Sequence, residues 1–572
     1  MSGLMHSHLP IQPLPHSSGN ELEKSGILPG EGNGVVNESL SDGKVRYHYN
    51  GKAAHEQADL RRSLTARHLA MLALASGIGT GLFLGSGSAL ATAGPLGVLL
   101  GYAVMGLVTA GIAFISAETA AFLPISGGFI RVIPMFTDKA LGITTGYTFW
   151  YLLCITAPAE IVAASSLIAF WRPDLNLAIW ISVFIAVVFV FNMLPVRFYG
   201  EIEFGLGLLK ILLVVGLVLA GLIVDWGGSP SGKFIGGKNW HPDPIKEYLV
   251  SGSTGRFLAF WSTLTNAAFA LGNIQIATSV GSECKNPRID VPKAMRRVFH
   301  RILAFYLSSL LVVGLILNSN DPRIGTASGT AGSPFVLAFQ TAGIRALPSI
   351  INAVVITSAF SSGNGVLFLA SRTLLGLASD GFAPKIFLKT NRFGAPYFAV
   401  LASSIFLPLA YLNLSNSTPA TVFGWFINLI SVAGLNVWVV ICIAYLRFYY
   451  GLKKKGIDRN ELPYKSWGQP YAAWATGFVS FLVVFFSGFS VFFPGNFSAS
   501  AFLSNYINTF VMIALYIILK VVLKSPWIRT TDMDFSEMQA IREERQYNED
   551  LVVDPMKRRG FVRRVLEKFT DE

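Results

Sequence analysis

Charged residues and cysteines are both scarce in this chain. Asp, Glu, Lys and Arg make up 14% of its 572 residues, whereas 52% are hydrophobic. The three cysteines, Cys154, Cys284 and Cys442, include no closely spaced pair, so we expect neither a disulfide framework nor a cysteine metal site. The chain has no HExxH motif and no nucleophile elbow, which argues against a membrane enzyme and implies no cofactor. Its basic residues form no patch interleaved with aromatics, which argues against nucleic acid binding.

Long apolar runs are what the chain does have. A run of about 17 to 25 mostly apolar residues is long enough to cross a bilayer as a helix. Such runs recur near 68–92, 97–121, 140–170, 176–194, 203–225, 256–282, 298–318, 347–376, 396–413, 421–448, 472–494 and 502–523. The sequence therefore predicts an all-α polytopic membrane protein with about twelve transmembrane helices.

Polar tails flank the apolar region. Residues 1–60 are rich in Gly, Ser, Asn and His and predict a disordered tail without a cleaved signal peptide, so the first span is expected to direct insertion. Residues 61–524 form the transmembrane domain and 525–572 a second tail, which alternates acid and base from Ser536 on and predicts a solvated helix. Lys and Arg concentrate in alternate short loops, which places both tails in the cytoplasm.

The first span contains an internal break signal. Ala75 to Gly81 reads Ala-Ser-Gly-Ile-Gly-Thr-Gly, and each glycine costs a helix interior about 1 kcal/mol relative to alanine. Backbone groups freed within hydrocarbon must be satisfied by a cavity or a ligand. The alternative is that small residues let a neighbouring helix pack closely.

A matching signal lies five spans later. The sixth span reads Phe269-Ala270-Leu271-Gly272-Asn273-Ile274-Gln275 at its centre, and Gly-Asn is a turn signal. Paired broken helices are typical of transporters built from inverted repeats. Their half-helix N-termini favour a carboxylate and their carbonyl ends favour a cation, a combination that suits a zwitterion.

Motifs along residues 60–535 resemble those of the fungal amino acid permeases, a family of the amino acid, polyamine and organocation transporter superfamily. The motifs that carry the resemblance are Ile78 to Phe83, Glu118 to Pro124, Ser126 to Phe129, Ala159 to Ile161, Phe170-Trp171, Tyr199 to Phe204, Ser282-Glu283, Asn286 to Arg288, Val291 to Ala294, Ser371 to Leu374, Ala383 to Lys385 and Leu462 to Tyr464. Their order and spacing identify the chain as a member.

The resemblance implies a five-plus-five inverted repeat with broken helices 1 and 6, near 68–225 and 256–413, followed by extra helices within 421–524. It also implies proton-coupled import of amino acids by alternating access at the plasma membrane, with lipid around the spans. The substrate carboxylate falls on Ser76 to Gly81, and the amine and a gating aromatic fall around Phe269 to Leu271. Endocytic control through Lys24, Lys44 and Lys52, by contact of the tails with a ubiquitin ligase or its adaptor, is a further implication.

One departure bears on coupling. Where relatives resemble Gly-Thr-Glu in the sixth span, this chain has Asn273-Ile274-Gln275, and an amide cannot exchange a proton at neutral pH. Polar residues such as Ser361 and Ser431 inside later spans add possible substrate contacts. The candidate substrate-binding residues are Ser76, Gly77, Ile78, Gly79, Thr80, Gly81, Phe269, Ala270, Leu271, Gly272, Asn273, Gln275 and Ser361.

Ionisable residues within spans are costly and mark functional sites. Glu160, midway along the third span, is a candidate proton acceptor, with a hydrogen-bonded structural acid as the alternative. Lys210 lies in the fifth span, and by the resemblance its ammonium takes the place that sodium fills in sodium-coupled relatives. The alternative is that it reaches to the inner membrane surface. Glu118, near the inner end of the second span, is read as a gating or capping residue.

Three functions are therefore compared. The leading one is a proton-coupled amino acid importer. The second is an amino acid receptor on the same fold that transports nothing, because Gln275 could reflect lost coupling. The third is a carrier of polyamines or of quaternary amines such as carnitine.

Overall fold

The structure is a computed structural model of the chain. It describes residues 35–39, 45–49, 78–125, 128–230, 232–272, 274, 278, 287–324, 333–414 and 419–553. Contacts divide the chain into two units, residues 1–49 and 50–572.

The first unit contains one antiparallel hairpin. Strand β1, Val35–Ser39, pairs with β2, Val45–Tyr49, in a register that sets Val35 opposite Tyr49. Valine and tyrosine are among the residues that strands favour. These strands lie in the segment that the average composition predicts to be disordered. The valine and tyrosine side chains favour a strand locally, although the composition of the whole segment does not.

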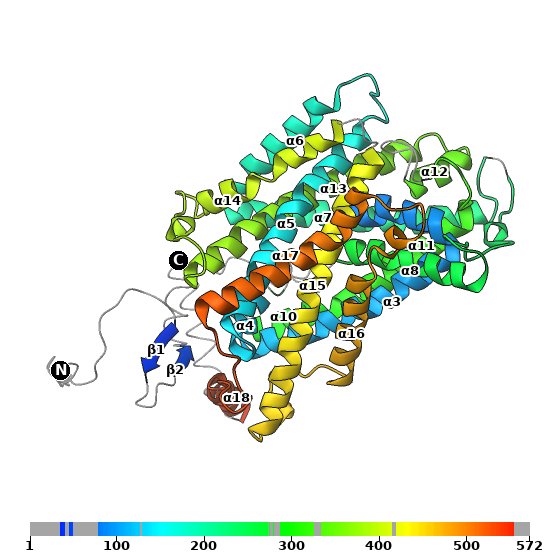
Figure 1. Cartoon of the computed structure of the whole chain (residues 1–572). Helices are drawn as coiled ribbons and strands as arrows, with labels where there is room; N and C mark the ends of the chain where they lie inside the picture. Colours follow the sequence, from blue (N-terminus) through cyan, green and yellow to red (C-terminus); the bar gives the residue numbers. More distant parts are fainter. Residues whose placement is uncertain are drawn as a thin grey trace, which may run out of the picture. The chain divides into compact units, whose positions relative to one another are not determined.

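The second unit is helical throughout its described part, and Figure 1 shows its elements in chain order. The helices are α3 (Ser86–Phe122), α4 (Phe129–Phe136), α5 (Lys139–Ile168), α6 (Leu177–Asn192), α7 (Val196–Asp225), α8 (Gly252–Ala270), α10 (Pro287–Arg301), α11 (Ser308–Ile316), α12 (Pro334–Thr341), α13 (Leu347–Ser379), α14 (Tyr397–Ser404), α15 (Pro419–Lys454), α16 (Tyr471–Phe485), α17 (Ala499–Leu523) and α18 (Glu537–Val553). Short π-helical turns, η2 (Gly81–Gly85) and η5 (Ile302–Leu307), precede α3 and α11.

Within the described residues, seven helices are long and apolar enough to cross a membrane, and three apolar helices are shorter. The first of the seven, Gly81–Phe122, bends sharply at Gly94 and so holds two spans. With the first counted as two spans, the seven long helices, the three shorter helices and α8 together give the twelve spans expected from the sequence. The all-α membrane fold is therefore confirmed, and the boundaries of the two repeats stay predictions.

The bend between the first two spans is held by the connection from α7 to α8. Gly94 has φ +75°, and a Cβ there would meet Pro244 O at 2.9 Å. Leu96 N donates to the same carbonyl, at 2.9 Å. Burial lowers the pKa of the Lys246 ammonium, which donates to Ala91 O at 2.8 Å. These bonds satisfy backbone groups that the end of one helix and the start of the next leave unpaired.

The third span is the buried centre of the helical unit. α5 packs against α13 and α15, and 89% of its most apolar window is buried, compared with 11% for α17. The apolar exposed face of α17 suits lipid. Seen from behind, α3, α8 and α11 run beside one another, and Figure 1 shows α6 and α14 together at the opposite edge.

The tail helix predicted after Ser536 is present as α18, but it is not solvated on all sides. Met538 and Ile541 are buried. Arg288 of α10 pairs with Glu537 and Glu544. The alternating charges therefore dock α18 on the helical unit.

Candidate functional site

The helix of the first span begins in the middle of that span. Ile78 and Gly79 are not helical, and the wide turn η2 leads directly into α3. Leu82 N donates to Gly79 O at 3.3 Å and closes the first turn. A helix start leaves N–H groups without helical partners, and π-helical turns often occur at functional sites. The described residues thus place a helix N-terminus where the sequence predicts a break.

The sixth span is interrupted at the predicted place. α8 ends at Ala270, the described residues Leu271, Gly272 and Ile274 are not helical, and Thr278 is again helical. The last carbonyls of a helix lack helical donors. One of them, Ala270 O, accepts a hydrogen bond from the Tyr306 hydroxyl at 2.9 Å.

The two interrupted helices meet at Gly81. A Cβ on this residue would lie 2.6 Å from Ala270 Cα and 3.1 Å from the Phe269 ring. Only glycine permits the start of one helix to approach the end of the other this closely. Residues nearly two hundred positions apart, both singled out in the sequence, are therefore neighbours.

Glu160 lies directly beside the start of the first helix. Its Oε2 accepts from the Thr80 hydroxyl at 3.0 Å, and its Oε1 accepts from the Ser362 hydroxyl of α13 at 2.9 Å. A Cβ on Gly79 would meet Oε1 at 2.9 Å. Ser358, also on α13, donates to Ile78 O at 3.1 Å. A buried carboxyl thus faces a helix N-terminus, which attracts negative charge.

A second carboxyl and an ammonium lie on the neighbouring helix α7. Lys210 Nζ is 3.9 Å from Glu203 Oε1, and both side chains are buried. Ser361 donates to Glu203 Oε2 at 2.6 Å. The ammonium also interacts electrostatically with Glu160. Within the described residues Lys210 Nζ has no hydrogen-bond partner, and the side chain does not extend to the surface.

A pocket opens beside the end of α8, between α5 and α15. We call it the α5–α15 pocket, and its cavity volume is about 20 Å³, room for about one water molecule. It is lined by Phe149, Leu152, Ala268, Phe269, Gly272, Ile430, Ser431, Gly434, Leu435, Val437 and Trp438. Phe269 and Gly272 belong both to this pocket and to the interrupted end of α8.

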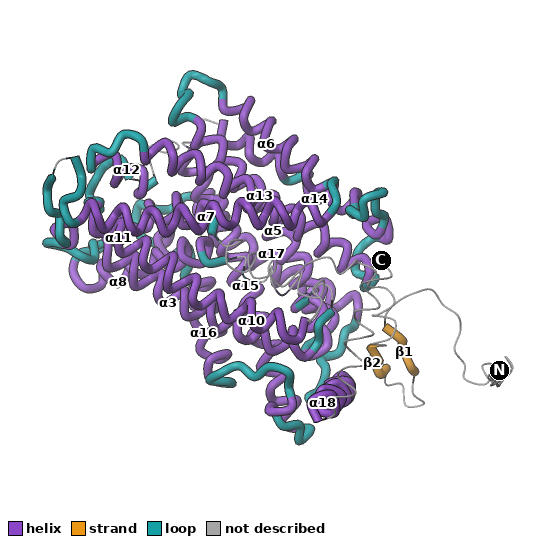
Figure 2. Tube along the Cα trace, turned by 180° about the vertical axis from the view of Figure 1, so that it is seen from behind, coloured by secondary structure: helices purple, strands orange, loops and turns teal. Residues whose placement is uncertain are grey.

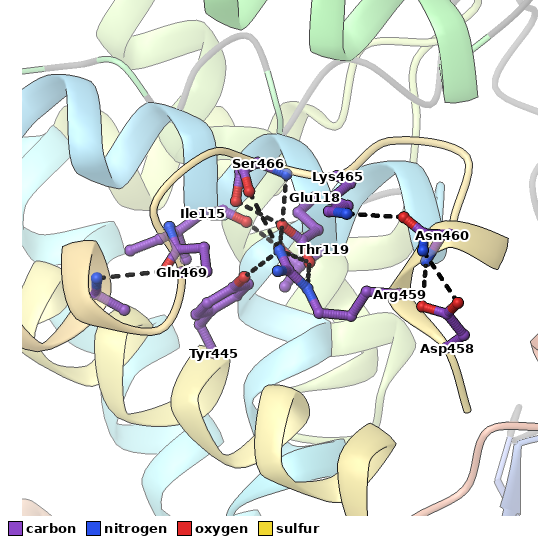
Figure 3. Close-up of polar contacts among 11 residues, drawn as sticks. Ile115, Glu118, Thr119, Tyr445, Asp458, Arg459, Asn460, Lys465, Ser466 and Gln469 are labelled. Carbon is purple, nitrogen blue, oxygen red and sulfur yellow. Dashed lines mark hydrogen bonds and ion pairs between the residues drawn. The ribbon is translucent and has the colours of Figure 1, made fainter. Parts of the chain in front are cut away.

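Glu118 lies away from these contacts, one turn before the end of α3. Figure 3 shows its carboxylate among groups of the connection between α15 and α16. Arg459 donates to Oε1 from Nε at 3.0 Å and from Nη2 at 2.9 Å, and Ser466 N donates to Oε2 at 2.8 Å. Arg459 also donates to the Tyr445 hydroxyl at 3.2 Å. The fully buried Glu118 side chain therefore fastens a loop to the end of α3.

Some predicted residues fall outside the described ones. They are Ser76, Gly77, Asn273, Gln275, Cys284 and the tail lysines Lys24, Lys44 and Lys52. Within the described residues, no group of three or more His, Cys, Asp or Glu is arranged to hold a metal ion.

Sequence reasoning missed Glu203 as a member of the site. In the sequence it stands within the Tyr199 to Phe204 motif at the start of the fifth span. The seven-residue spacing between Glu203 and Lys210, two helical turns, places both on one face of α7 and was the available signal. The hydroxyl of Ser361, predicted as a substrate contact, is engaged by Glu203.

The chain is similar to known proteins over its whole membrane-spanning region. The family model for amino acid permeases matches residues 68–530. A proline-specific permease of Emericella nidulans is 38% identical over 83% of this chain and 87% of its own length. A dicarboxylic amino acid permease of Saccharomyces cerevisiae is 36% identical over 86% and 82%. A lysine-specific permease of the same yeast is 37% identical over 73% and 68%.

Solved structures agree with the fold. A mutant form of the Eremococcus coleocola manganese transporter has a TM-score of 0.52 and 14% sequence identity, covering 86% of this chain and 98% of its own. At this identity the likeness concerns the fold alone.

Proposed function

Since the chain belongs to the amino acid permease family and is a multi-pass membrane protein that transports amino acids, we propose that it imports them together with a proton. Import takes place across the plasma membrane by alternating access, and both tails of the protein lie in the cytoplasm. Lys and Arg of the alternate short loops support this orientation, because such residues are retained on the cytoplasmic side.

The substrate lies between the two interrupted helices. Its carboxylate binds backbone N–H groups at Ile78 to Gly81, and its ammonium binds the carbonyl end of α8 near Ala270. Neither partner needs a charged side chain, because helix ends carry partial charges of the required sign. Gly81 touches α8 in this structure, so substrate binding moves the end of α8 away from Gly81. The non-helical residues after α8 act as the hinge.

Proton coupling runs through Glu160, and its contact with the first helix is the observation that carries the proposal. A substrate carboxylate at Gly79 would lie against the Glu160 carboxyl, which is 2.9 Å from the position of a Cβ there. Two carboxylates this close repel each other, so the substrate anion binds better when Glu160 carries a proton. By thermodynamic reciprocity, bound substrate also favours that proton.

Lys210 and Glu203 are the charged residues near the Glu160 carboxyl. Their ion pair brings a cation and a carboxylate together in the interior, and the ammonium also interacts electrostatically with Glu160. Release of the Glu160 proton therefore leaves a carboxylate with a cation in reach instead of an isolated charge in the membrane.

Reconstituted vesicles with an imposed pH gradient test this function. The unchanged protein should accumulate a labelled amino acid when the outside is acidic, and a sodium gradient alone should drive nothing. Glu160→Gln should still bind and exchange amino acid but should lose accumulation. Glu247→Gln, an exposed acid in the loop before α8, is the matched control and should keep it. Accumulation by Glu160→Gln at the unchanged rate refutes the role of this carboxyl.

A further inference from the structure

The interrupted end of α8 is held by a side chain of the seventh span. Tyr306 belongs to the π-helical turn η5, and its side chain is fully buried. Its hydroxyl donates to Ala270 O, the last carbonyl of α8, at 2.9 Å. Two earlier carbonyls of this helix end, Ala267 O and Phe269 O, accept from backbone N–H groups just after the helix. Among these three bonds, only the one to Ala270 O comes from a side chain, which can rotate away.

A second tyrosine lies close to the first, on the second span. Tyr102 of α3 is fully buried, and within the described residues its hydroxyl has no hydrogen-bond partner. It interacts electrostatically with Tyr306, and η5 packs against α3. The second span also approaches α8 closely, since a Cβ on Gly101 would overlap the Thr263 side chain. Buried hydroxyl groups in folded proteins nearly always have a partner, so a state in which Tyr102 is bonded is expected.

Tyr306 is also within electrostatic reach of the proposed coupling group. It interacts with Glu160, which lies beside the start of the first helix. The Tyr306 hydroxyl therefore lies at the site proposed for the substrate, on the carbonyl end where the ammonium binds.

We propose that Tyr306 is a positioning residue that holds Ala270 O while the site is empty and gives this carbonyl up to the substrate ammonium, with the Tyr102 hydroxyl as its second partner. This inference rests on the site assigned in the proposed function. A buried carbonyl at a helix end is costly to leave without a donor. The exchange of donors keeps Ala270 O bonded in both the empty and the loaded state.

Tyr306→Phe and Tyr102→Phe should change the affinity for amino acids in opposite directions. Without the Tyr306 hydroxyl, the ammonium binds a carbonyl that has no other donor and displaces nothing, so the dissociation constant should fall about tenfold. Without the Tyr102 hydroxyl, the displaced Tyr306 has no second partner, and the dissociation constant should rise about tenfold. The maximal rate of uptake by Tyr306→Phe should fall, because no hydroxyl replaces the departing ammonium. A purely structural role would weaken binding in both variants.

Equilibrium binding to the purified protein in detergent tests this exchange with paired probes. The amino acids are alanine, lysine and aspartate, and each is compared with the acid of the same skeleton that lacks the α-amino group, namely propionate, ε-aminocaproate and succinate. The changes should appear with the amino acids and be absent with the acids, because the acids leave Ala270 O to Tyr306. Tyr147→Phe is the matched control, since the Tyr147 hydroxyl donates to another backbone carbonyl, Phe382 O, at 2.8 Å. It should leave the dissociation constants unchanged.

Equal changes for an amino acid and its paired acid, or changes in the same direction in both variants, overturn the inference. If Tyr306→Phe does not fold, Tyr102→Phe decides alone, because it keeps the bond to Ala270 O, and an unchanged affinity for amino acids then refutes the exchange. If amino acids bind but no vesicle accumulates them, the proposed coupling has failed, and the binding comparison still decides on Tyr306.

Discussion

The ion pair between Lys210 and Glu203 makes a prediction that can be worked from the structure. The two charged atoms are 3.9 Å apart and both side chains are buried. With an effective dielectric constant of about 20, Coulomb's law gives an attraction of about 4 kcal/mol. Lys210→Met leaves Glu203 buried without its cation, and Glu203→Gln leaves the ammonium without its nearer carboxylate. Each change should lower the free energy of unfolding by about 3 to 5 kcal/mol.

The double variant Lys210→Met with Glu203→Gln should lose much less than the sum of the two. Removing both charges leaves no uncompensated ion at this position, so the coupling energy of the double-mutant cycle should approach 4 kcal/mol, on the order of the Coulomb attraction. Denaturant unfolding of the protein in detergent, followed for all four forms, measures it.

An exposed pair provides the control for this cycle. Arg172 and Asp174 are 2.8 Å apart, with 58% and 61% of their side chains exposed. Solvent screens such a pair, so the corresponding cycle should give a coupling energy much smaller than that of the buried pair. If the losses of Lys210→Met and Glu203→Gln simply add, the two groups do not interact in the folded protein, and the reasoning about the buried charges is wrong.

Three further predictions concern other contacts. Gly81→Val should abolish uptake at unchanged surface expression because its Cβ would overlap the backbone of α8, whereas Gly85→Ala, with only ordinary contacts, should retain it. Arg459→Ala leaves the buried carboxylate at the end of α3 without its main partner and should lower the melting temperature in a thermal shift assay. Arg288→Ala should speed cleavage of α18 in limited proteolysis, and Lys293→Ala, an exposed change on the same helix, should not.

Much of the fold could be predicted because a membrane span has a required length and composition. The predicted end of the fifth span and both ends of the third fall within two residues of the helix ends in α7 and α5. The break near Gly272 was readable because a Gly-Asn step opposes a helix. The shorter helices also coincide with predicted apolar runs, but their ends differ more from the predicted ends.

Other features depend on contacts between distant segments and have no local signal. The pairing of Ser361 with Glu203 joins α13 to α7, and the bonds of Arg459 to Glu118 join a loop to the end of α3. The α5–α15 pocket likewise exists only because three helices leave space between them. The docking of α18 was missed because alternating charge alone does not tell a solvated face from a paired one.

The proposed function gives separate tasks to separate helices. In this proposal, the helix ends at Gly81 and Ala270 bind the groups that all amino acids share through backbone, which carries no net charge. The titratable groups belong to other helices, with Glu160 on α5 beside the first helix end and Lys210 on α7.

Variants should therefore separate substrate binding from proton coupling in one experiment. Gly81→Val is expected to abolish exchange of amino acid as well as accumulation, because its Cβ would overlap the backbone of α8. Glu160→Gln is expected to keep exchange and to lose the dependence of uptake on the pH gradient. A Glu160→Gln protein that lost exchange together with accumulation would show that binding and coupling share one structural element.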